Sequence, residues 1–140
     1  RGTRLNESNQ PWRIAIEQPV PTNGLIAQRI VWLSDAAMAT SGDYRNFYEM
    51  DGTRISHTID PRSGRPVEHR LFSVSVVDEL CARADGLATA LAVLGPEEGY
   101  ELAASQGWAA LFIVSGDEGG FIEQMTPSFA SMVRKQRELQ

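Results

Sequence analysis

Residues 71–96 of the chain, LFSVSVVDELCARADGLATALAVLGP, decide the fold. Apolar and small polar side chains alternate at its start, and this period of two predicts a β-strand at 71–77. The face that we expect to be apolar contains Phe72, Val74 and Val76. Residues 80–94 are rich in alanine and leucine, which predicts a helix, and the following Gly95-Pro96 is a typical helix end. A strand that leads into a helix is therefore the centre of the expected fold.

Other segments extend this unit in both directions. Pro96 can be the first residue of a second helix that runs through Ala104. An apolar pair at 47–48 stands before Asp51-Gly52, a dipeptide typical of tight hairpin turns. The other expected elements are strands at 12–17, 25–33, 54–56, 108–114 and 121–123, a loop at 60–66 and a terminal helix at 128–140. This order predicts an α+β fold, an antiparallel-rich sheet with two or three helices, in a single domain over 1–140 with a polar lead-in at 1–10.

Composition limits the kinds of protein that this chain can be. Of its 140 residues 42% are hydrophobic and 22% charged, and the net charge is −5. The acidic balance without a basic stripe argues against nucleic acid as a partner. No run reaches the roughly 20 apolar residues of a membrane span, and the single cysteine, Cys81, cannot close an intrachain disulfide. The chain starts at Arg1 rather than at Met, so we expect it to be a piece of a longer polypeptide.

A carboxyl and a hydroxyl group lie one turn apart in the expected helix. Asp85 and Thr89 are four residues apart, so both side chains project from one face. Oxygen ligands of this kind suit Mg²⁺, which keeps waters and binds substrate phosphates. The alternative is a solvent-facing aspartate, with the threonine hydroxyl bonded to a backbone carbonyl one turn earlier. The spacing leaves both interpretations open.

His57 follows the expected strand 54–56 and stands three residues before Asp60. An imidazole suits a general base near neutral pH, above all when a carboxylate orients it. A turn at Asp60-Pro61 could bring that carboxylate to the ring. The alternative is a surface histidine beside a turn-capping aspartate. The second histidine, His69, has no such context, and we interpret it as exposed.

Hydroxyl groups, a glycine and a carboxylate are concentrated in residues 39–44, ATSGDY, within a segment that fits neither strand nor helix pattern. Gly42 allows close backbone approach, and Ser41 with neighbouring amides could hold a phosphate. Asp43 adds the carboxylate, and Tyr44 could stack on an aromatic ligand. The alternative is a turn between strands that uses these residue types for their conformations.

Four motifs in series resemble those of the ApbE family, the FAD:protein FMN transferases. They are ATSGDYRNF at 39–47, SHTIDPRSGRPV at 56–67, SVSVV at 73–77 and ADGLATAL at 84–91. The opening PWRIAIEQP at 11–19 is also similar to a strand of that family. Each motif is modest alone, but their order and spacing are specific. The resemblance covers almost the whole chain and implies the C-terminal part of an ApbE-like, T-fold-like domain.

The resemblance implies a chemical activity. In the family, FAD binds with a divalent ion, usually Mg²⁺, near its pyrophosphate, and a threonine hydroxyl of a client flavoprotein attacks the phosphorus of the FMN half. AMP leaves, and FMN stays attached to the client through a phosphoester bond. One alternative in the same pocket is an FAD pyrophosphatase, which gives FMN and AMP with water as the nucleophile. Another is a non-catalytic flavin-binding or interaction fragment.

The resemblance also implies roles for individual residues. Asp85 and Thr89 match the metal ligands, and Ala88 stands where some relatives place a further acidic ligand, a contact that is then missing here or supplied by water. His57 matches the histidine proposed as base, and Asp60 would support the loop or that histidine. The residues implied to contact the flavin nucleotide are Ile59, Ser41, Gly42, Asp43 and Tyr44.

Members of the family are much longer than this chain. The resemblance implies that a missing N-terminal half of the same protein supplies much of the FAD contact, a backbone carbonyl ligand to the metal, and secretion and lipid signals. It thereby implies a periplasmic protein held at the inner membrane as a lipoprotein. We expect the chain by itself to bind FAD weakly and to turn over slowly or not at all. Neither the client protein nor the oligomeric state follows from the sequence.

Overall fold

The computed structural model describes residues 10–18, 27–42, 47–50, 53–116 and 120–138. Its strands are β1 (Trp12–Glu17), β2 (Ala27–Leu33), β3 (Ala37–Gly42), β4 (Phe47–Met50), β5 (Thr53–Ser56), β6 (Ile59–Asp60), β7 (Arg65–Pro66), β8 (Leu71–Asp78), β9 (Ala109–Ser115) and β10 (Phe121–Met125). Its helices are α1 (Cys81–Ser105) and α2 (Pro127–Glu138). The main sheet has the order β10-β9-β8-β3, with every neighbouring pair antiparallel, and the other strands form the pairs β1-β2, β4-β5 and β6-β7. The predicted α+β class is confirmed.

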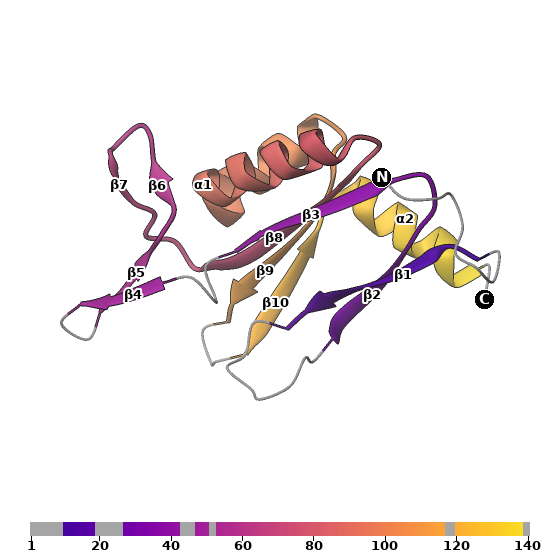
Figure 1. Cartoon of the computed structure of the whole chain (residues 1–140), viewed down its shortest axis with the longest axis horizontal. Coiled ribbons are helices and arrows are strands. Elements are labelled where there is room, and N and C mark those ends of the chain that lie inside the picture. Colours follow the sequence, from indigo (N-terminus) through magenta and orange to yellow (C-terminus); the bar gives the residue numbers. More distant parts are fainter. Residues whose placement is uncertain (1–9, 19–26, 43–46, 51–52, 117–119, 139–140) are drawn as a thin grey trace.

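The main sheet lies between two layers. Helix α1 covers one face, and α2 with the β1-β2 pair covers the other (Figure 1). In β9, Ala110 and Phe112 belong to the core under α1, whereas Leu111 and Ile113 belong to the core under α2, and all four are fully buried. Successive residues of a strand face opposite sides, so a central strand covered on both faces must be apolar throughout. The strand predicted at 108–114 meets this requirement.

Strand β8 has an irregular register at its start. Its pairing with β9 shifts just after Leu71, and Leu71, Val74 and Val76 all pack under α1. Phe72 lies on the opposite face, with its ring centroid 5.1 Å from that of Phe121. The prediction that Phe72 shares a face with Val74 and Val76 is therefore wrong, because a bulge interrupts the alternation of a strand.

Helix α1 consists of two helical segments that meet at Gly95. This glycine has φ +85° and ψ −177°, outside the helical region, and Pro96 follows it. Proline has no N–H for the carbonyl four residues earlier, so the hydrogen-bond ladder is interrupted there. The predicted end of one helix and start of a second at Gly95-Pro96 are confirmed. In the described part of the chain, no helix has the length and apolar character needed to cross a membrane.

Two predicted connections differ from the structure. Residues 37–42 form β3 at the edge of the main sheet, where Thr40 Oγ1 lies 2.7 Å from Ser75 Oγ on β8, so the alternative of a turn is wrong for these residues. The loop predicted at 60–66 is a tight hairpin: Ile59 pairs with Pro66 and Asp60 with Arg65 across the turn at 61–64. We call residues 59–66 the β6-β7 hairpin. The predicted turn at 51–52 and most of the lead-in at 1–10 lie outside the described residues.

A buried hydroxyl group, that of Thr126, stabilises the packing of α2 on the main sheet. Thr126 is completely buried, and its Oγ1 accepts the N–H of Ala110 at 3.0 Å and that of Phe129 at 3.4 Å. The same hydroxyl donates to the carbonyl of Trp108 at 2.7 Å. Thr126 thus caps α2, whose first residue is Pro127, and ties the helix to β9.

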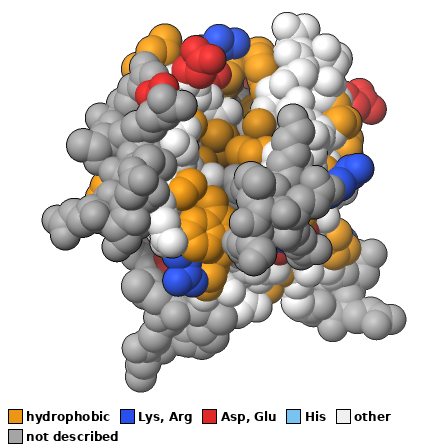
Figure 2. All heavy atoms as spheres, turned by 90° about the vertical axis from the view of Figure 1, so that its right-hand side faces the viewer, with side chains coloured by type: hydrophobic (Ala, Val, Ile, Leu, Met, Phe, Trp, Pro, Cys, Tyr) orange, Lys and Arg blue, Asp and Glu red, His pale blue; other side chains and the backbone are white. Residues whose placement is uncertain are grey.

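An ion pair joins the β1-β2 pair to the edge of the main sheet. Two guanidinium nitrogens of Arg29 lie 3.0 and 2.6 Å from Glu123 Oε2, and Gln28 donates to Oε1 at 2.8 Å. Both charged side chains are largely buried. Apolar side chains also reach the surface, as Figure 2 shows for one side of the molecule. Exposed apolar surface is ordinary in folded proteins and does not by itself define a site.

Candidate functional site

The first segment of α1 and the end of β3 bring oxygen atoms together. Thr89 Oγ1 donates to the backbone carbonyl of Asp85 at 3.1 Å and lies 3.2 Å from Ser41 Oγ. A threonine hydroxyl has one hydrogen, so Ser41 donates in the second pair. All three side chains lie at the surface, with Asp85 and Thr89 exposed and Ser41 half-buried. The hydrogen bond from the threonine hydroxyl to a backbone carbonyl, which the alternative of a solvent-facing aspartate predicts, is therefore present. The Thr89 hydroxyl also contacts Ser41, which lies 48 positions away in the chain.

Ala88 lies on the other face of the same helix. Its methyl group is fully buried in the core under α1 and offers no ligand atom. The alanine therefore cannot supply the further acidic ligand that the family resemblance implies for some relatives at this position. The described residues also contain no cluster of three or more histidine, cysteine, aspartate or glutamate side chains. Asp85, Thr89 and Ser41 offer hard oxygen atoms that fit Mg²⁺ as a partial ligand set, to which water and phosphate oxygens can add.

His57 is carried by the tight connection between β5 and the β6-β7 hairpin. Its side chain is exposed. The preceding Ser56 is buried, and its Oγ accepts the backbone N–H of Thr58 at 2.9 Å. This local hydrogen bond fixes the backbone on both sides of His57.

Asp60 is engaged by Arg62 within the hairpin turn. Its Oδ1 accepts the backbone N–H of Arg62 at 2.8 Å, and the guanidinium donates to both carboxylate oxygens at 3.0 to 3.1 Å. These hydrogen bonds from Arg62 lower the pKa of Asp60 and raise that of the guanidinium. Arg62 also contacts Glu98 on the second segment of α1 at 3.0 Å. The hydrogen bonds from Arg62 to the Asp60 carboxylate thus lie within the hairpin turn, and the role of Asp60 in the site stays a prediction.

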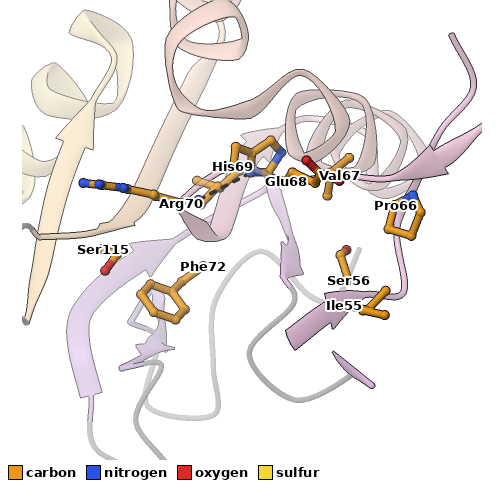
Figure 3. A pocket seen from close by; sticks show the side chains of 10 residues that line it. Ile55, Ser56, Pro66, Val67, Glu68, His69, Arg70, Phe72 and Ser115 are labelled. Carbon is orange, nitrogen blue, oxygen red and sulfur yellow. Dashed lines mark hydrogen bonds between the residues drawn. The ribbon is translucent and has the colours of Figure 1, made fainter. Parts of the chain in front are cut away.

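An open hollow separates the hairpin from the main sheet. Its volume is about 660 Å³, and its walls come from the end of β5, residues 66–72 and Ser115 (Figure 3). We call it the hairpin hollow. A much smaller recess is lined by Ser41 and Gly42, and His69 and Phe72 line both the recess and the hollow.

His69 was missed by the sequence analysis. It is half-buried rather than exposed, and its Nε2 lies 2.8 Å from the carbonyl oxygen of Ala92 in α1. That partner is 23 residues away in the chain, so no local pattern indicates it. The one sequence feature that could have indicated this contact is Pro96, because a proline leaves the carbonyl of Ala92, four residues earlier, without a helical N–H donor.

The residues implied to contact the flavin nucleotide are only partly placed. Ile59 is 50% exposed, a large value for an apolar side chain, and it stands at the start of the hairpin. Ser41 and Gly42 line the small recess. Asp43 and Tyr44 lie outside the described residues.

The fold and the site together define a class of protein. It is an α+β layer protein in which a helix over an antiparallel sheet presents a carboxylate and a hydroxyl beside a strand-end serine and an open hollow. Residues 1–112 match the sequence profile of the ApbE family. The chain belongs to the ApbE family.

Relatives of known name agree with this assignment. The chain is 47% identical over 131 residues to an FAD:protein FMN transferase of Vibrio cholerae and 43% identical over 129 residues to one of Klebsiella pneumoniae. These matches cover 94% and 92% of the chain but only 39% and 36% of the relatives. The chain therefore spans less than half the length of these curated relatives.

Solved structures give the same result. The flavinyl transferase ApbE of Pseudomonas stutzeri in its apo form superimposes with a TM-score of 0.78 at 49% identity, over 93% of this chain and 39% of that one. The flavin transferase ApbE of Vibrio cholerae superimposes with a TM-score of 0.77 at 46% identity, over 91% of this chain and 39% of that one. The fold is that of a part of an ApbE protein.

Proposed function

We propose that this chain forms part of the active site of an FAD:protein FMN transferase, which moves FMN from FAD to a threonine of a client flavoprotein. The observation that carries the proposal is the convergence of Thr89 and Ser41, 3.2 Å apart, beside the exposed Asp85. The names of the relatives support the same activity. Because the chain spans only 39% of the Vibrio cholerae relative, the remaining groups of the site would come from the rest of a longer protein.

Mg²⁺ is the cation proposed for this site. Asp85 and Thr89 would hold it, and the hydrogen bond from Ser41 would orient the threonine oxygen so that a lone pair stays free. When bound, the cation would neutralise negative charge that develops on the pyrophosphate during transfer. With two ligands from α1, the site depends on water and on nucleotide phosphate to complete the coordination.

His57 is proposed as the general base. The client hydroxyl oxygen forms a bond to the phosphorus of the FMN half, the bond from that phosphorus to the AMP oxygen breaks, and the hydroxyl proton passes to the imidazole. AMP leaves as a phosphate monoester, so charge and atoms balance. The exposed position of His57 on a short, hydrogen-bonded loop supports this role, because a protein substrate must reach the base.

Flavin contact is proposed for the neighbours of these groups. The half-exposed Ile59 offers an apolar surface to the flavin nucleotide, and Ser41 and Gly42 line the small recess near the proposed cation site. A location in the periplasm as a lipoprotein stays a prediction, and it rests on the family resemblance.

The proposal is tested with the full-length protein that contains this chain. It is incubated with FAD, Mg²⁺ and a peptide that carries the acceptor threonine, and the peptide is weighed by mass spectrometry. We expect the mass of the peptide to rise by one FMN, with one AMP released for each transfer. A peptide with valine in place of the threonine and a reaction with EDTA are the controls.

Two other results would count against transfer. AMP release with an unmodified peptide would identify an FAD pyrophosphatase. Neither AMP release nor retained flavin would identify a non-catalytic fragment or interaction protein.

A further inference from the structure

The break in α1 deprives one carbonyl of its helical donor. Residue 96 lies four positions after Ala92 and is a proline, so Ala92 cannot receive the usual N–H. The imidazole of His69 replaces the missing N–H donor, with its Nε2 2.8 Å from the Ala92 oxygen. The N–H of Leu71 points at Nδ1 from 3.4 Å, so Nδ1 is the acceptor and Nε2 carries the proton. A neutral ring in one tautomer thus joins α1 to the start of β8.

Gly95 makes room for this ring. A Cβ atom built on Gly95 would lie 2.7 Å from His69 Cδ2 and 3.1 Å from Cγ, which is too close for a carbon–carbon contact. The φ of +85° at Gly95 also lies in the region that favours glycine. The break in the helix and the histidine therefore fit one another sterically as well as through the hydrogen bond.

His69 stands between the two parts of the proposed site. On one side, Ala92 is three residues after Thr89 in the same helical segment. On the other side, residues 67–70 join the β6-β7 hairpin to β8, and His69 is a wall of both the hairpin hollow and the recess at Ser41. Figure 3 shows the ring above the hollow, beneath the ribbon of α1. A shift of this ring would change the position of the helix relative to the hairpin.

We propose that His69 is a positioning residue, which holds the helical segment with Asp85 and Thr89 in register with the hairpin that follows His57. This inference rests on the proposed function, because it assigns His69 to the geometry of that same cation site. His69 acts through Ala92 and does not itself bind the cation or the nucleotide phosphates. Its effect should therefore appear first in cation affinity.

The first experiment compares two amide side chains in the full-length protein. In His69→Gln the amide nitrogen can reach the place of Nε2, whereas in His69→Asn the same group is one methylene too short. We expect His69→Asn to weaken binding of Mn²⁺ with FAD, measured by electron paramagnetic resonance without client, by about 10- to 100-fold. His69→Gln should restore most of that affinity. The Mg²⁺ concentration for half-maximal transfer should shift in parallel, with a smaller change in the rate at saturating Mg²⁺.

The second experiment tests the contact without reference to catalysis. Gly95→Ala should lower the thermal unfolding midpoint more than Gly107→Ala, because both glycines have positive φ but a Cβ at Gly107 meets nothing within 4 Å. In a His69→Ala background the excess loss at Gly95 should become smaller, since the clashing ring is gone and only the backbone strain of Gly95 remains.

The outcomes separate the two proposals. Equal Mn²⁺ affinity in wild type, His69→Gln and His69→Asn, with normal FMN transfer, would overturn the role of His69 and leave the proposed function standing. The expected order of Mn²⁺ affinities in a protein that transfers no FMN would support the role of His69 and overturn the proposed function.

Discussion

Two threonine hydroxyls on opposite faces of the main sheet have different surroundings. Thr126, under α2, is fully buried, and its hydroxyl bonds to the backbone at Ala110, Trp108 and Phe129. Thr89, on α1, is exposed, and its hydroxyl is oriented by Asp85 and Ser41 while one side stays open to solvent. The α2 face therefore uses its buried hydroxyl to hold the fold, and the α1 face leaves an oriented hydroxyl exposed where we propose a cation to bind.

The largest expected effect comes from the α1 face. Asp85→Asn in the full-length protein should slow Mg²⁺-dependent AMP release by about 100-fold or more, because the cation loses its charged ligand. The free energy of unfolding should change by less than about 0.5 kcal/mol, since the side chain is exposed. Enzyme assays measure the rate of AMP release, and urea unfolding measures the free energy of unfolding. Glu101→Gln, an exposed carboxylate on the second segment of α1, is the matched control, and full activity in Asp85→Asn would remove Asp85 from the ligand set.

The reverse result is expected on the α2 face. Thr126→Val should lower the free energy of unfolding by about 2 kcal/mol, because the buried N–H and carbonyl partners lose their hydrogen bonds and α2 loses its cap. The rate of FMN transfer at a temperature where the variant is folded should not change. Ser131→Ala, which removes an exposed hydroxyl from α2, is the control for urea unfolding. Equal stability of the two variants would contradict the structural role of Thr126.

The smallest effect concerns the hairpin turn. Arg62→Gln should raise the pKa of Asp60 toward the ordinary value of an aspartate, about 3.9, because the guanidinium that lowers it is gone. The lowered pKa means that the Asp60–Arg62 interaction is fully present above the ordinary value and is lost as the pH falls through the lower one. Carboxyl chemical shifts in an NMR titration measure this change. Glu98→Gln should leave the Asp60–Arg62 contact and the lowered pKa of Asp60 in place. A similar rise of the Asp60 pKa in Arg62→Gln and in Glu98→Gln would contradict Arg62 as its cause.

Local chemistry was enough to predict several elements. Gly95-Pro96 predicts a helix break because neither residue continues a helix, and the break is present. The apolar run at 108–114 predicts a doubly covered strand, and β9 lies between both cores. The four-residue spacing of Asp85 and Thr89 predicts one helix face, and the Thr89 hydroxyl lies 3.1 Å from the Asp85 carbonyl with both residues exposed.

The remaining features depend on partners far away in the chain. Residues 37–42 are small and lack a clear apolar alternation, and they form β3 because β8 supplies the pairing edge. Phe72 changes face because of a register shift against β9, which the sequence of β8 alone does not contain. His69 is half-buried because the carbonyl that needs its proton belongs to Ala92. The contact of Ser41 with Thr89 likewise becomes visible only when the edge strand is placed beside the helix.

The interruption at Gly95 also has an electrostatic consequence. A single uninterrupted helix would have one positive and one negative end, but two segments that meet at an angle have two of each. The negative end of the first segment faces the ring nitrogen of His69, which brings a proton to it. The positive end of the second segment begins at Pro96, and Glu97 and Glu98 follow directly. Two acidic side chains that would lie far from either end of a continuous helix are thereby placed at the partial positive charge of a helix start, and Glu98 also contacts Arg62.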